Sequence, residues 1–134
     1  MFIIYYNSSY NYPYGLLLTF NRNDVKASEN KIIHSLAGSY YYKMILRSDN
    51  KIILVYSYNN NNTYLGYLTI TFSGETYTIG STNILSTTKS IGTLIHKAVD
   101  IGDNRWFVPN TISTFSGAIL TVNSNDTLSL SGTT

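Results

Sequence analysis

The sequence predicts an all-β fold, in which antiparallel four-stranded sheets repeat along the chain like the blades of a β-propeller. Three observations predict it: a composition that suits strands, short apolar runs between polar turns, and a repeat of about fifty residues. Thirteen Tyr accompany many Asn, Ser and Thr, which favour strands and turns over helices. With 43% hydrophobic and 12% charged residues, the 134-residue chain is expected to fold as a single domain, 1–134.

Composition also excludes several classes of protein. The formal net charge of +2 is small and the basic residues are scattered, so no nucleic-acid partner is expected. The absence of cysteine excludes disulfides and thiolate metal sites. We recognise no signal peptide after Met1, and the longest apolar runs fall far short of the roughly twenty residues of a membrane span. We therefore expect no membrane insertion.

Strands are expected wherever apolar residues run between polar turns. The stretch 51–58 is apolar from Ile52 to Tyr56, which indicates a strand covered on both faces, whereas 76–79 alternates like a half-exposed strand. The turns at Asn23 and Gly74 contain residues that tolerate a positive φ. The expected strands are, in order, 2–6, 15–20, 25–34, 40–46, 51–58, 64–72, 76–80 with its continuation 82–85, 92–99, 105–108, 115–122 and 127–132.

A pattern of glycine, apolar residue and turn acid occurs three times, and a shift of 51 residues superposes the copies. The superposed sets are Gly15, Gly66 and Gly117; Leu17, Leu68 and Ile119; and Asp24, Glu75 and Asp126. Upstream, a shift of 54 residues superposes 49–51 on 103–105, and the difference falls in a loop, where insertions are tolerated. These matches divide the chain into repeats at approximately 1–35, 40–86 and 92–134.

A period near fifty residues with four strands per unit is typical of propeller blades. The first repeat begins at the counterpart of strand 51–58, so it is incomplete and lacks a leading strand. Fewer than three complete blades cannot close a ring, since propellers have about four to eight. We therefore expect either a longer protein or a homo-oligomer whose copies complete each other's sheets and cover their open edges.

Candidate catalytic and metal-binding residues are sparse. Each acidic turn holds one carboxylate, whereas a calcium loop gathers several oxygens, so a turn-forming role is favoured for Asp24, Glu75 and Asp126 over calcium or sugar binding. His34 and His96 have no second ligand at metal spacing, which favours packing roles. No nucleophile elbow or phosphate-binding loop is present. We expect no enzyme activity, no metal and no cofactor, although a facing carboxylate pair for glycoside hydrolysis stays open.

Tyrosines frame an amide-rich loop in the second repeat, and also the equivalent loop in the first. Tyr and Trp combine a flat apolar face with a polar tip, which suits contact with sugar rings or with another protein. The alternative for any single Tyr is ordinary packing within and between sheets. The candidate ligand-binding residues are Tyr58, Asn60, Asn61, Tyr64 and Trp106, which is the only Trp.

The stretch 51–85 resembles the repeat found in propeller-type regions of bacteriophage tail-fibre and related virion adhesion proteins. That repeat has an apolar strand ending in Tyr, an Asp/Asn-rich loop, Tyr-x-Gly, a strand, Ser-Gly, and a short strand ending in Ile-Gly-Ser. The match is partial in 1–35 and weakens after Trp106, where Asn110 replaces the strand-ending Tyr. The matching residues are Tyr56, Tyr64, Gly66, Ser73, Gly74, Ile79, Gly80 and Ser81.

The resemblance implies a non-enzymatic structural or adhesion protein of a virus particle, of the phage-fibre type. Its loops are expected to bind a glycan or protein on the host surface, and its partners are further copies or other virion proteins. It would be extracellular once assembled in the virion. The alternative is a stand-alone oligomeric lectin, and a fragment of a carbohydrate-active enzyme ranks below both.

Overall fold

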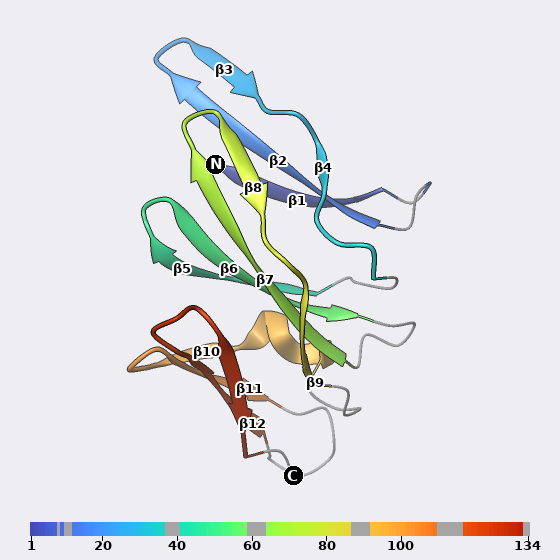
Figure 1. Cartoon of the computed structure of the whole chain (residues 1–134), viewed down its shortest axis with the longest axis vertical. Helices are drawn as coiled ribbons and strands as arrows, with labels where there is room; N and C mark the ends of the chain where they lie inside the picture. The colour runs from blue at the N-terminus through green and yellow to red at the C-terminus, as the bar shows by residue number, and fades with distance from the viewer. Residues whose placement is uncertain are drawn as a thin grey trace.

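The described residues form three antiparallel β-sheets that stack face to face, and the chain builds them one after another (Figure 1). The computed structural model describes residues 1–7, 9, 12–36, 41–58, 64–86, 92–109 and 117–132. Within these ranges the secondary structure consists of strands and one 3₁₀-helix. The predicted all-β, antiparallel class is therefore confirmed.

The first sheet has four strands in the described part of the chain, with the longest in its centre. The strand expected at 25–34 is divided in two, because the Ser28 Oγ accepts a hydrogen bond from the Leu17 backbone N–H at 3.0 Å, where a strand would offer its carbonyl. The strands are β1 (Phe2–Asn7), β2 (Tyr12–Asn21), β3 (Asp24–Ala27) and β4 (Lys31–Ile32), in the order β1-β2-β3, with β4 also paired to β2.

The middle sheet has five strands among the described residues, in the order β5-β6-β7-β8, with β9 paired to the other part of β7. β6 is buried without interruption from Ile52 to Tyr58, which confirms that this apolar run is covered on both faces. The strands are β5 (Tyr42–Ser48), β6 (Lys51–Tyr58), β7 (Tyr64–Ser73), β8 (Thr76–Ile79) and β9 (Asn83–Ser86).

The third sheet has the order β10-β11-β12-β13 and follows a short helix. The strand expected at 92–99 is wrong, because Gly92–Lys97 forms a 3₁₀-helix, η1. Ile95 and Ala98 are both buried, and a spacing of three residues places them on one face of a helix with three residues per turn. The strands are β10 (Val99–Gly102), β11 (Arg105–Pro109), β12 (Gly117–Val122) and β13 (Leu128–Ser131).

Two hydrophobic cores lie on opposite faces of the middle sheet. Successive residues of β6 alternate between them, as the two-residue period of a strand requires. The core toward the first sheet contains Leu17, Ile33, Ile52, Leu54, Tyr56, Tyr58, Leu68, Ile70 and Tyr77. The core toward the third sheet contains Ile45, Ile53, Val55, Leu65, Tyr67, Ile95, Ala98, Val108, Ala118, Leu120, Val122 and Leu128.

The register between the first and middle sheets differs from the 51-residue shift expected from the glycines. Leu17 and Leu68, which that shift superposes, face each other across one core instead of facing the same way. The hairpin turns show the displacement, because Arg22–Asn23 corresponds to Gly74–Glu75, a shift of 52 residues. A slip of one residue turns every side chain to the other face of its strand. The expected superposition is therefore wrong by one residue in this part.

The first sheet has no counterpart of β5 and β10 among the described residues, since β1 is its edge strand. Met44 and Leu46 of β5 lie on the face of the middle sheet that is turned toward the first sheet, because Ile45 between them faces the other core. They are 41% and 72% exposed. The middle and third sheets each have the additional strand, paired to β6 and to β11.

Candidate binding site at the loop end of the sheets

The central hairpins of the first and middle sheets point the same way, so the stack has two distinct ends (Figure 1). At one end, named the loop end, β6 finishes at Tyr58 and β7 begins at Tyr64, and these two residues are register partners. At the other end, named the hairpin end, lie the turns Arg22–Asn23 and Gly74–Glu75.

Two of the five predicted binding residues meet at the loop end. The rings of Tyr58 and Tyr64 pack edge to face with centroids 5.5 Å apart. Tyr58 is only 8% exposed, whereas Tyr64 is half-buried at the border of the core. Burial, and next the neighbouring Tyr64, raise the pKa of Tyr58, so its hydroxyl stays protonated at neutral pH. Tyr64 is therefore the member of the pair with surface left for a ligand.

The structure does not place the other three predicted residues next to Tyr58 and Tyr64. Asn60 and Asn61 lie outside the described residues. Trp106 is the second residue of β11, close to the turn at 103–104, and it packs against the core between the middle and third sheets. It therefore lies at the hairpin end and on the opposite face of the middle sheet from Tyr58.

A column of aromatic rings continues from Tyr58 into the molecule and includes His34, whose place in it the sequence does not predict. His34 stacks on Tyr56 with ring centroids 4.0 Å apart, and Tyr56 contacts Tyr58 edge to face at 6.4 Å. His34 is 4% exposed, and burial lowers its pKa to about 4, so the imidazole is neutral at pH 7. Its Nδ1 accepts a hydrogen bond from the Leu36 N–H at 3.3 Å. The packing role expected for His34 agrees with this position.

Gly66 determines where the Tyr56 ring lies. It is the register partner of Tyr56, and a Cβ atom built on it would be 2.8 Å from the ring. No side chain other than hydrogen leaves room for the ring at this distance. Burial also raises the pKa of the Tyr56 phenol to about 12, opposed in part by the Thr82 side chain.

The turn acids join one sheet to the next. Glu75 of the middle sheet accepts a hydrogen bond from Lys26 Nζ of the first sheet at 3.1 Å. Asp126 of the third sheet binds Arg47 Nε at 2.8 Å and Lys51 Nζ at 2.9 Å, both from the middle sheet. Hydrogen bonds from Lys51 and Arg47 lower the pKa of the Asp126 carboxyl. These two acids are thus occupied by ion pairs between sheets.

The third turn acid, Asp24, differs from the other two. It begins β3 in the first sheet, is exposed, and has no ion-pair partner in the described part of the chain. The described residues also contain no cluster of three or more His, Cys, Asp or Glu that could hold a metal ion.

Two hollows border the first sheet. A pocket of about 200 Å³ lies between the first and middle sheets and is smaller than the range of about 300–1,000 Å³ typical of ligand sites. Across it, Lys31 Nζ donates to the Tyr77 carbonyl at 2.7 Å. An open, largely apolar groove of about 560 Å³ lies at the hairpin end, with Phe20, Met44 and Phe72 in its lining.

Comparisons with protein-family models, with curated proteins and with solved structures gave no significant match. Within the described ranges, no helix has the length and apolar character needed to cross a membrane.

Proposed function

We propose that this protein is a non-enzymatic structural and adhesion component of a virus particle, of the phage-fibre type. Its three sheets serve as propeller-type blades, and the loop end contacts a glycan or protein on the host surface. The resemblance of 51–85 to virion adhesion repeats supports this role. So does the stacking of consecutive sheets of the same orientation, which carries several loops to one end and suits weak, repeated contacts.

The observation that carries the proposal is the pair Tyr58 and Tyr64. They close the β6–β7 hairpin at the loop end, with a half-buried aromatic face on Tyr64 directly beside the Asn-rich segment 59–63. An aromatic face next to amide groups can stack on a sugar ring while the amides hydrogen-bond its hydroxyl groups.

Binding to glycan arrays and to whole bacterial cells tests the proposal. We expect the fluorescently labelled protein to bind above background, and Tyr64→Ala, Asn60→Ala and Asn61→Ala each to weaken binding severalfold. Leu46→Ala is the matched control, because Leu46 is 72% exposed on β5 near the hairpin end and should leave binding unchanged. Absence of binding to every glycan and cell type would refute the adhesion role. Binding that survives all three loop variants would refute the loop-end site.

A further inference from the structure

The first and third sheets are the outermost layers of the stack, and each has a face with no other sheet packed on it in the described part of the chain. On the first sheet, Leu17 faces the core, so its neighbours Leu16 and Leu18 face outward. Phe20 is 59% and Val25 56% exposed on the same face, and Tyr5 and Tyr14 stack there with centroids 5.8 Å apart. The outer face of the first sheet comprises Ile3, Tyr5, Tyr14, Leu16, Leu18, Phe20, Val25 and Ile32.

The third sheet has a corresponding outer face. Trp106 and Val108 pack toward the middle sheet, so the alternate residues of β11 and their register partners face away from it. Val99 is 58% exposed there. The outer face of the third sheet comprises the apolar residues Val99, Phe107, Pro109 and Ile119 and the polar residues Arg105, Thr121, Ser129 and Ser131.

We propose that these two faces bind each other in different copies, so that the first sheet of one chain packs on the third sheet of the next. Within one chain this kind of contact occurs twice, because the middle sheet is covered by the first sheet and the third sheet is covered by the middle sheet. In each case the preceding sheet of the chain covers the face. The corresponding face of the first sheet is its outer face, which no preceding sheet covers. Packing the third sheet of another copy there would continue the internal stacking and cover a patch of the kind that marks protein interfaces.

The way in which the chain stacks its own sheets identifies the partner as a second copy. In both internal contacts, an apolar sheet face is buried by the face of the neighbouring sheet of the same chain. Arg105 begins β11 as Lys51 begins β6, and it lies on the outer face of the third sheet, where its side chain, 46% exposed, reaches Asp103 of its own turn. Asp24 is not its counterpart, because Asp24 is the register partner of Asn21 and faces the middle sheet on the same side of β3 as Lys26.

A closed head-to-tail dimer is the expected product. Two chains with three sheets each supply six sheets, within the range of about four to eight over which blade stacks close into rings. A head-to-tail contact that did not close would instead grow into filaments. The interface uses the outer faces and not the loop end, so it is independent of the adhesion role, whereas closure into a ring rests on the blade role proposed above.

Light scattering on the size-separated chain over a range of concentrations tests the interface. We expect a mass of twice the chain's 15.0 kDa at high concentration. Phe20→Glu should shift the midpoint of association at least about tenfold upward, because it places a charge within an apolar contact. Ile84→Glu is the control, since Ile84 is 62% exposed on β9 and lies on neither outer face, so it should leave the midpoint unchanged.

A second variant on the same face separates a specific contact from a folding defect. Val25 is 56% exposed, so Val25→Lys should fold like the wild type and yet weaken association about threefold to tenfold, because it places a charge within the apolar contact. A monomer at every concentration would overturn the proposal. Association that is unchanged by both Phe20→Glu and Val25→Lys would overturn it as well.

Discussion

Gly66 and Tyr56 depend on each other across the β6–β7 ladder. The Tyr56 ring occupies the space where any larger residue at position 66 would place its Cβ, at 2.8 Å. Tyr56 is fully buried and stacks on His34, so it has no free space to move into. A single hydrogen atom at position 66 therefore supports the aromatic column behind the loop end.

We predict that Gly66→Ala lowers the free energy of unfolding by about 1–3 kcal/mol, the usual cost of overpacking a well-packed site. Urea denaturation followed by tyrosine fluorescence measures it. Thr78→Ala is the matched control on the exposed side of β8 and should change stability by less than about 0.5 kcal/mol. Equal stability of Gly66→Ala and the wild type would show that the Tyr56 ring can move, contrary to the packing described.

Burial of neutral His34 predicts a stability that depends on pH. Its pKa is about 4 in the folded protein and 6.5 as the ordinary value, so the unfolded chain binds more protons between these values. The free energy of unfolding should therefore fall by about 3 kcal/mol from this group as pH falls from 6.5 to 4. Above pH 6.5 the group has no further effect.

The variant His34→Phe checks the source of this dependence. Phe retains a ring to stack on Tyr56 but does not titrate, so urea denaturation at several pH values should give a flatter profile between pH 6.5 and 4. The lowered pKa of Asp126 acts in a separate window. Its contribution is present above its ordinary value of 3.8 and is lost as pH falls through the folded value below that. Identical profiles for variant and wild type would contradict the assignment to His34.

At the scale of elements, ion pairs next to hairpin turns link successive sheets with unequal strength. Asp126 is 22% exposed and receives hydrogen bonds from both Arg47 and Lys51. Glu75 and Lys26 are 57% and 58% exposed, so water and salt screen that pair.

We predict that Asp126→Asn destabilises the protein by about 1–2 kcal/mol, because it leaves two cations facing an uncharged group. Asn also tolerates the positive φ of 64° at this position, so the turn itself should persist. Glu75→Gln should cost less than about 1 kcal/mol. Thermal melts at low and high salt compare the two. A larger loss for Glu75→Gln than for Asp126→Asn would contradict the difference in burial.

Element by element, the predictions succeeded where one pattern dominated and failed where two overlapped. The continuous apolar run of β6 indicated burial on both faces, and the structure confirms it. Residues 92–99 have apolar residues both adjacent and three apart, and the latter spacing forms the helix η1. The glycine spacing indicated a repeat but not its register, since Gly66 is required by one ring and not by the repeating face.

The candidate site was partly predictable for a similar reason. Tyr58 and Tyr64 follow and precede one loop, so their proximity is implied by any hairpin at 59–63. Trp106 is a candidate binding residue only because of the chemistry of its side chain, and the strand register places it against the core between the middle and third sheets. His34 stacks on a residue 22 positions away, and no local pattern predicts such a contact.

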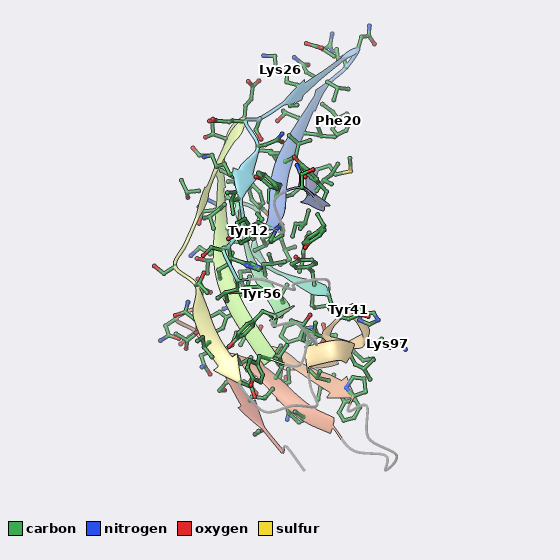
Figure 2. All side chains as sticks on the ribbon, turned by 90° about the vertical axis from the view of Figure 1, so that its right-hand side faces the viewer. Tyr12, Phe20, Lys26, Tyr41, Tyr56 and Lys97 are labelled. Carbon is green, nitrogen blue, oxygen red and sulfur yellow. The ribbon has the colours of Figure 1, made fainter. Side chains whose placement is uncertain are left out.

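At the scale of the whole molecule, the stack leaves a particular kind of surface open. Among the residues that the structure describes, the middle sheet is covered on both faces, while the first and third sheets are each covered on one. Figure 2 views the stack from the side, with Tyr56 in the middle of the stack and Phe20 on the first sheet. Apolar sheet faces are stable when another layer covers them, which is the physical reason to expect a neighbour on each outer face of the stack.

The most direct test of that expectation is a cross-link between copies. The chain contains no cysteine, so Val25→Cys in one sample and Arg105→Cys in another supply the only thiols, one on the outer face of the first sheet and one on that of the third. After mixing and mild oxidation, we predict a disulfide-linked dimer that contains one of each variant, in yield well above a Val25→Cys mixture with Ile84→Cys. Equal yields from the two mixtures, or dimers formed only between identical variants, would contradict the head-to-tail stacking of sheets.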